Sequence, residues 1–225
     1  MVYCVADMCV EEFVQDFGKV VGRGDLVILD RKVVGRICLD QPYIDVGLGD
    51  IVALSKDSQV VCVVPFRCFD RIECTNSVCI VDCGKILCLQ DEIFANSGYV
   101  SRNRIFLTHT SIGKIGLVID NDLMYVGVWS KYIGSGVRYM LHCNHTQCDG
   151  KGIVMLQAMS LAIGCVAIGV WCDQTIVASG GKIVDIAVGK FRPLWINHSV
   201  EKSYLTTSPI LVYQAGNQKD KNSQK

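Results

Sequence analysis

The stretch from residue 114 to 129 constrains the fold of this chain more than any other. Its apolar positions 115–119 predict a buried strand, and the strand leads directly into the polar triplet Asp120, Asn121 and Asp122. Asp and Asn favour tight turns because their side chains bond to nearby backbone groups. The following segment, residues 123–129, is again apolar, and we expect it to be helical. A strand, a sharp turn and a helix in this order indicate a layered fold that contains both element types.

Strand and helix patterns alternate through the rest of the chain. Two hairpins are expected, one turning at residues 82–84 and one at Gly180 and Gly181. The alternation predicts an α/β fold with mixed sheets, in one domain over residues 1–215 and a disordered polar tail over 216–225. The expected helices cover residues 11–21, 48–56 and a segment from Gly152, and the expected strands cover 25–29, 60–64 (ended by Pro65), 76–81, 85–89, 115–119, 137–141, 166–170, 175–179 and 182–186.

Composition excludes several classes of protein. The net charge is zero and no basic run is interleaved with aromatic residues, so we expect no nucleic-acid partner. The first seven residues contain no basic segment of the kind that opens a secretory signal. The 13 cysteines are an odd number in a long chain, which favours reduced thiols in the cytoplasm over a disulfide framework.

Residues 152–171 contain no charged side chain and are long enough to cross a bilayer. Gln157, Ser160, Gly164 and Gly169 interrupt the run, however, and its second half has the pattern of a strand. A buried helix followed by a buried strand accounts for the same run, so we expect no membrane partner.

Taken in order, these elements resemble the nitrilase (carbon–nitrogen hydrolase) superfamily over nearly the whole chain. The segments that match are the early strand up to Asp30 and Arg31, the helix and strand over 48–64, the hairpin that starts at Asn76, the strand and turn over 114–122, the stretch 139–144, the helix and strand over 156–170 and the hairpin over 175–186. The resemblance implies an αββα sandwich with mixed sheets. It also implies a homodimer of the four-layer type αββα-αββα, with residues 123–129 as part of its surface.

The resemblance also implies a catalytic triad, which this chain lacks. In the family a cysteine attacks the substrate, a glutamate takes the thiol proton and a lysine stabilises the intermediate. The cysteine position is Asp120 here, and the glutamate position is Arg31, preceded by Asp30 in place of a proline. The lysine position falls within residues 90–92, most closely on Asp91, and no lysine occurs over residues 86–113. Three replacements together predict a protein without the family's catalysis, a pseudoenzyme.

Two alternatives keep some chemistry. Cys143 lies between His142 and Asn144, with His145 close by, and a thiol near a histidine can be activated; Asp120 is itself a carboxylate that could act as a nucleophile. Either residue would make the chain an amidase-type hydrolase with a non-standard site, although a buried, inert thiol is the more common reading. The histidines and cysteines within residues 142–148 are zinc ligand types, but their spacing is unusual, and we expect no metal and no cofactor.

Opposite charges replace the triad at two of its positions. If the fold is kept, Arg31 and Asp120 face one pocket and should lie within reach of an ion pair. The pair could be structural, or it could bind a small zwitterion, amide or carboxylate. The residues expected around this pocket are Arg31, Asp120, Asn121, His142, Cys143 and Asn144. We therefore expect a nitrilase-like protein that acts by binding a small molecule or a protein partner.

Overall fold

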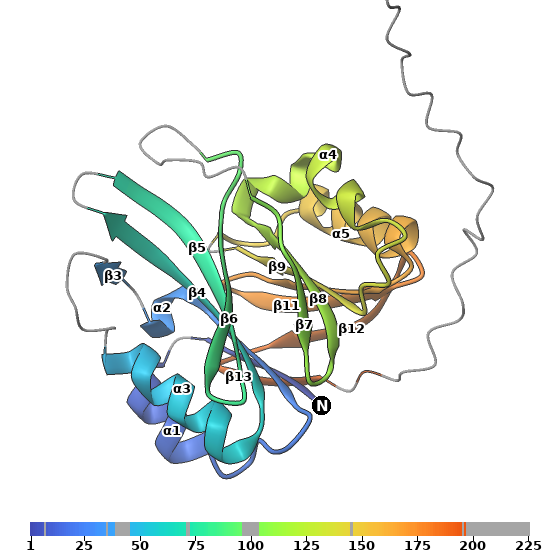
Figure 1. Cartoon of the computed structure of the whole chain (residues 1–225). Helices are drawn as coiled ribbons and strands as arrows, with labels where there is room; N and C mark the ends of the chain where they lie inside the picture. Colours follow the sequence, from blue (N-terminus) through green and yellow to red (C-terminus); the bar gives the residue numbers. More distant parts are fainter. Residues whose placement is uncertain are drawn as a thin grey trace, which may run out of the picture.

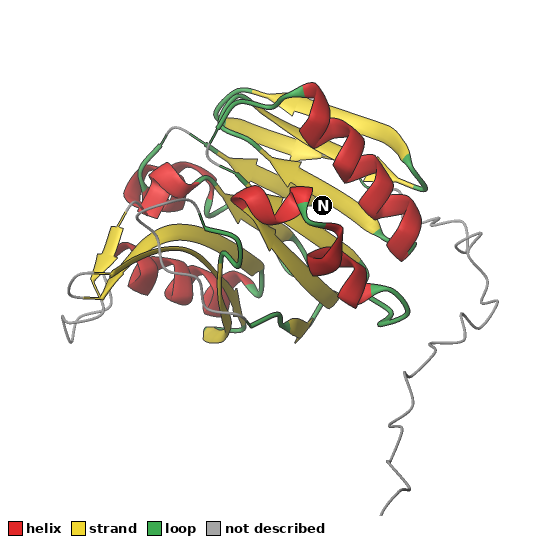
Figure 2. Cartoon of the chain, turned by 90° about the horizontal axis from the view of Figure 1, so that it is seen from above, coloured by secondary structure: helices red, strands yellow, loops and turns green. Residues whose placement is uncertain are grey.

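The computed structural model of the chain describes residues 1–6, 8–34, 36–38, 46–70, 73–95, 104–144, 146–194 and 196. Within these residues the chain forms two mixed β-sheets packed face to face, with helices on both outer sides (Figures 1 and 2). This is the α/β fold with mixed sheets that the sequence predicts, in the sandwich that the family resemblance implies. The tail expected over residues 216–225 lies outside the described residues.

The first sheet holds the N-terminal strands together with the last described strand. Its order is β13-β1-β2-β4-β5-β6, and β3 pairs with β4 beside this path. Strands β1, β2 and β4 run parallel to one another, whereas β5, β6 and β13 pair antiparallel with their neighbours. The strands are β1 (Val2–Val5), β2 (Leu26–Leu29), β3 (Arg36–Cys38), β4 (Val61–Asp70), β5 (Glu73–Asp82), β6 (Lys85–Asp91) and β13 (Phe191–Leu194).

The second sheet has the order β12-β11-β10-β9-β8-β7. Its three central strands are parallel, so the carboxyl ends of β8, β9 and β10 meet at one edge, where Ile119, Cys143 and Val170 lie in register. Side chains that follow these strands are therefore brought together. The strands are β7 (Leu107–Thr110), β8 (Gly113–Ile119), β9 (Tyr139–Cys143), β10 (Val166–Val170), β11 (Gln174–Ser179) and β12 (Lys182–Val188).

The helices cover the outer faces of the sheets. Helices α1 (Val10–Phe17) and α3 (Val46–Ser58) pack on the first sheet, and α5 (Gly150–Ile163) packs on the second (Figure 2). A third cluster, which includes Ile28, Ile80 and Leu141, fills the space between the sheets. Short helical turns complete the described chain: α2 (Arg31–Val34), η1 (Asp120–Met124), α4 (Val126–Trp129) and η2 (Ser130–Tyr132).

Most expected elements are present, with four corrections. Helix α1 ends at Phe17 rather than at residue 21. Strand β4 continues through Pro65 to Asp70. On one side it pairs with β2 at residues 61–63 and with β3 at residues 67–69, so no described strand lies opposite Pro65 there. A proline, which has no N–H group to donate, is tolerated at such a position. Strand β9 is shifted to Tyr139–Cys143. The segment after the turn forms η1 and α4, separated by Tyr125 in an extended conformation, rather than one helix.

Strands β1, β3, β7 and β13 were not predicted. Each is three or four residues long, too short to show a clear period on its own. The uncharged run at 152–171 is indeed a helix followed by a strand, α5 and β10. None of the helices described here has the length and apolar character needed to cross a membrane.

Candidate functional site

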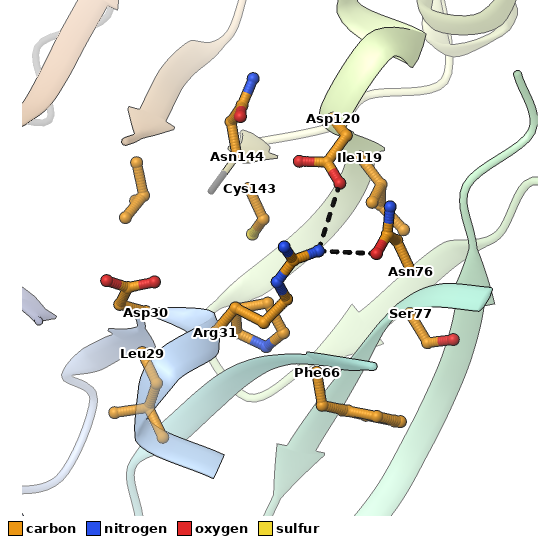
Figure 3. Close-up of a pocket in the computed structure, with 12 residues that line it drawn as sticks. Leu29, Asp30, Arg31, Phe66, Asn76, Ser77, Ile119, Asp120, Cys143 and Asn144 are labelled. Atoms are coloured by element: carbon orange, nitrogen blue, oxygen red, sulfur yellow. Dashed lines mark hydrogen bonds and ion pairs between the residues drawn. The ribbon is translucent and has the colours of Figure 1, made fainter. Parts of the chain in front are cut away.

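The candidate site lies where the carboxyl ends of strands from both sheets face each other. Asp30 and Arg31 follow β2, and Asp120 follows β8 directly. Cys143 is the last residue of β9, and Asn144 comes next. Figure 3 shows these side chains around one small pocket, so the fold brings together the two replaced triad positions that follow β2 and β8.

Asp120 occupies a sharp backbone turn. Its φ of 44° lies in the left-handed region, which aspartate and asparagine adopt more readily than most residues do. The neutral imidazole of His142 supports the turn, because its Nε2 lies 3.0 Å from the Asp120 carbonyl oxygen and can donate a hydrogen bond to it. Burial lowers the pKa of His142, which keeps the ring neutral. The predicted turn after the strand at 115–119 is therefore present, and His142 holds it from behind.

Arg31 reaches from α2 into the pocket. Its Nη1 lies 3.6 Å from Oδ2 of Asp120 and donates a hydrogen bond of 2.6 Å to Oδ1 of Asn76 (Figure 3). The predicted ion-pair contact between Arg31 and Asp120 is thus confirmed. Because the Arg31 and Asp120 side chains are only 12% and 7% exposed, water screens this pair weakly.

Glu92, rather than Asp91, joins this group. Its Oε2 accepts a hydrogen bond of 2.8 Å from Asn76, and its Oε1 accepts two from Asn121, at 3.2 Å from the backbone nitrogen and 3.1 Å from Nδ2. Burial raises the pKa of Glu92, and the charge of Asp120 raises it further, while the bonds from the two asparagines oppose the shift. Asn76 therefore links Arg31 to Glu92.

The other two residues considered for the lysine position face elsewhere. Asp91 accepts a hydrogen bond of 2.5 Å from Ser77, and Gln90 donates one of 3.1 Å to the Leu117 carbonyl. The assignment of Asp91 to the lysine position stays a prediction. Of the three residues, Glu92, just past the end of β6, is the one bonded to Asn76 beside Arg31.

Asp122 fixes the loop that follows β6. It is fully buried, and its carboxylate accepts hydrogen bonds from the backbone nitrogens of Ile93 and Phe94, the latter at 2.8 Å. Burial raises the pKa of Asp122 to about 6, against these bonds, and the nearby charges of Glu92 and Asp120 add to the rise. These contacts give Asp122 a structural role in holding the loop.

Cys143 and His142 do not form a dyad. Both lie inside β9 rather than after it, and neighbouring strand residues point to opposite faces. Cys143 packs in the cluster between the sheets, whereas His142 meets the Trp171 ring edge-on at 5.1 Å. Burial, with the charges of Asp120 and Asp30, raises the pKa of the Cys143 thiol, so the reactive thiolate is suppressed.

The pocket itself is small. It has a volume of about 10 Å³, close to the minimum for a single water molecule. Of the six residues expected around it, Arg31, Asp120, Cys143 and Asn144 line it, while Asn121 and His142 do not. Phe66 and Asn76 also line the pocket and were not predicted. Asn76 could have been found, because it opens the hairpin used for the family resemblance.

The described residues contain no group of three or more His, Cys, Asp or Glu side chains arranged to hold a metal ion. His145, one of the ligand types noted within residues 142–148, lies outside the described residues.

Comparisons with solved structures identify the fold. The Nit3 protein of Saccharomyces cerevisiae, a nitrilase-superfamily member, aligns with a TM-score of 0.68 and 13% identity over 85% of this chain and 86% of its own. A CN-hydrolase superfamily protein of Xanthomonas campestris, with an arsenic adduct in its active site, aligns with a TM-score of 0.70 and 11% identity over 83% of this chain and 85% of its own. A carbon–nitrogen hydrolase of Helicobacter pylori gives 0.65 and 12%, over 83% and 84%.

Sequence comparisons add no relative to this set. No protein-family model matches the chain, and no curated protein matches it. The structural similarity shows that this chain has the fold of the nitrilase superfamily.

Proposed function

We propose that this chain, with its nitrilase-superfamily fold, is a non-catalytic member of that group in which Arg31 closes the former reaction pocket. The observation that carries the proposal is the position of the Arg31 guanidinium, between Asp120 and Asn76. It occupies the place where the resemblance expects a general base. A permanently protonated guanidinium cannot accept a proton from a nucleophile.

The remaining polar groups of the site support the same proposal. Asp120 faces Arg31 as an ion-pair partner, and Glu92 is engaged by Asn76 and Asn121. A substrate with a carbon–nitrogen bond would therefore find carboxylates that are already bonded to other side chains. It would find no cation at the lysine position. Loss of a nucleophile alone commonly lowers the rate of an enzyme by several orders of magnitude.

The alternative, an amidase that uses Cys143 or Asp120, has less support. Cys143 is 5% exposed, its pKa is raised, and His142 points to the other face of β9. Small-molecule sites typically have volumes of roughly 300–1,000 Å³, whereas this pocket has about 10 Å³. An amide substrate could enter only if Arg31 moved.

A turnover assay tests the proposal. The purified protein, kept reduced, is incubated with a panel of aliphatic and aromatic amides and nitriles, and ammonia release is measured. We expect no release above that of the buffer. Saturable turnover that disappears in Cys143→Ala or in Asp120→Asn would instead establish the hydrolase and identify its nucleophile.

We further infer that the protein acts through its surface, as a homodimer or with a protein partner, in the cytoplasm. Helix α5 exposes Val154 and Leu161, and the segment after the turn exposes Tyr125 and Val126. Exposed apolar residues grouped on helices are typical of subunit contacts. Sedimentation equilibrium of the wild type and of Val154→Glu tests the dimer: we expect a dimer for the former and a monomer for the latter.

A further inference from the structure

A second cleft lies next to the candidate site, where the loop after β6 meets the turn after β8. Its volume is about 390 Å³, within the range of roughly 300–1,000 Å³ that is typical of small-molecule sites. The lining residues are Phe94, Ala95, Asn121, Met124 and Tyr125, and none of them lines the Arg31 pocket. A small molecule therefore fits this cleft, although it does not fit the Arg31 pocket.

The walls of the cleft are aromatic and exposed. The rings of Phe94 and Tyr125 stack with 3.9 Å between their centroids and 16° between their planes. These two side chains are 44% and 45% exposed, and Met124 beside them is 46% exposed. Aromatic rings attract cations because their faces carry negative charge, and they also pack well against apolar groups. A cation with an apolar body suits such walls.

Both rings are attached to backbone that a single buried residue holds in place. The Asp122 carboxylate accepts hydrogen bonds from the backbone nitrogens of Ile93 and Phe94, the latter at 2.8 Å. The backbone nitrogen of Tyr125 donates to the Asp122 carbonyl oxygen at 3.1 Å. The two walls are thus positioned before any ligand arrives, and a preformed site loses less conformational freedom on binding.

The floor of the cleft offers a hydrogen-bond acceptor. Asn121 donates from its backbone nitrogen and from Nδ2 to the same oxygen, Oε1 of Glu92. Its Oδ1 accepts no hydrogen bond from the part of the chain that the structure describes. This oxygen is therefore left to accept one from the N–H group of a ligand.

Negative charge lies just behind the cleft. None of the five lining residues is charged, but Glu92 is bonded to Asn121 at 3.1 Å and Asp122 to the Phe94 backbone at 2.8 Å. Neither carboxylate forms an ion pair within the described residues, because Arg31 contacts Asp120 instead. The potential in the cleft therefore favours a cation and disfavours an anion.

We propose that this cleft binds a small organic cation, a protonated amine with an aromatic or aliphatic body. The ammonium group donates a hydrogen bond to Oδ1 of Asn121, and the body packs against Met124 and Tyr125. The cleft lies outside the Arg31 pocket, so the proposal does not depend on whether that pocket is catalytic.

A nuclear magnetic resonance titration of the isotope-labelled, full-length protein at pH 8 tests the proposal. The probe is benzylammonium, and the matched probes of similar shape are neutral benzyl alcohol and anionic benzoate. Tyr125→Ala removes an aromatic wall, and Tyr125→Phe restores the ring. Glu92→Gln removes the charge behind Asn121 and keeps an acceptor. Phe106→Ala is the matched control, because Phe106 is an exposed aromatic residue outside the cleft.

We expect benzylammonium to shift the backbone amide signals of Asn121 and Tyr125 saturably, benzyl alcohol to bind more weakly, and benzoate not to bind. Tyr125→Ala should weaken benzylammonium binding about 10-fold, whereas Tyr125→Phe and Phe106→Ala should match the wild type. Glu92→Gln should weaken the binding of benzylammonium and leave that of benzyl alcohol unchanged.

Three results would overturn the proposal. The first is the absence of saturable shifts at Asn121 and Tyr125, and the second is equal affinity for the three probes. The third is wild-type affinity in Tyr125→Ala. The same titration of Val154→Glu separates the cleft from the dimer proposed above. Binding to that variant alone would show that a second copy of the chain fills the cleft, which would also overturn the proposal.

Discussion

The guanidinium of Arg31 lies 3.6 Å from the carboxylate of Asp120, and the two side chains are 12% and 7% exposed. They come from different sheets, at the ends of β2 and β8. The contact therefore ties the two halves of the sandwich together at the place where the resemblance expects catalysis. Removing one partner of a buried ion pair destabilises the fold, because the other charge stays buried without that compensation.

Arg31→Ala should lower the free energy of unfolding by about 3 kcal/mol, because it removes the guanidinium that the buried Asp120 carboxylate and the Asn76 oxygen contact. Arg31→Lys keeps the charge but not the planar donor, so its loss should be smaller. Urea denaturation at pH 7 measures both variants. An Arg31→Ala protein as stable as the wild type would show that the pair contributes nothing.

Asp122 should make the protein less stable as the pH rises. Its pKa is raised to about 6 in the fold, from an ordinary value of 3.8, so the native state binds more protons than the unfolded state between these values. Stability is then lost as the pH rises through this window, and the raised pKa of Glu92 acts in the same direction.

Asp122→Asn removes this titration and keeps one acceptor for the backbone nitrogens of Ile93 and Phe94. Denaturation at pH 4.5 and pH 7.5 compares the variant with the wild type. We expect the loss of stability between the two values to be about 2 kcal/mol smaller in the variant. An equal loss of stability in both proteins would show that groups other than Asp122 cause the pH dependence.

Gly116 is required by close packing behind the strand that leads into the Asp120 turn. A Cβ there would clash with Sδ of Met140 and lie 2.8 Å from Cε1 of Tyr132. Gly116→Ala should therefore cost about 1–3 kcal/mol. Gly127→Ala is the matched control, because a Cβ at Gly127 meets nothing within 4 Å. Thermal unfolding should show a lowered midpoint for Gly116→Ala alone, and equal midpoints would contradict the packing argument.

How far the sequence predicts this structure differs from element to element. The strand at 115–119, the turn at Asp120 and the hairpin at Asp82, Cys83 and Gly84 carry strong local signals, and all three are present. Cys83 and Gly84 both have positive φ, as a tight hairpin turn requires. Strand β1 shows no such signal. It is only four residues long, and it forms a strand because it pairs with β2 and β13, which are distant from it in the sequence.

The opposite charges of the candidate site could be predicted from the sequence, but its hydrogen bonds and the directions of its side chains could not. Arg31 and Asp120 could be placed together from the family resemblance, and they do meet. Which of residues 90–92 lies beside Arg31 depends on how far β6 extends, and the sequence does not show that. The hydrogen bonds of Glu92 to Asn76 and Asn121 place Glu92 there. His142 and Cys143 face opposite ways because β9 extends to Cys143, so both residues lie within the strand. The expected strand ended at residue 141, and the sequence pattern did not show the extension by two residues.

We propose that Arg31 fills the pocket and so shields Cys143. Alkylation by iodoacetamide, with mass mapping of each cysteine, tests it in the folded wild type and in Arg31→Ala. Cys62, fully buried in the first sheet, is the internal control. Because burial is the main cause of the raised Cys143 pKa, water entering the emptied pocket should restore reactivity.

We predict that Cys143 is alkylated at least 10-fold faster in Arg31→Ala than in the wild type, while Cys62 remains unmodified in both. Exposed Cys9 should react readily in each protein. Rapid alkylation of Cys143 in the wild type, at the rate of Cys9, would contradict the account, because the pocket would then be open and its thiol active.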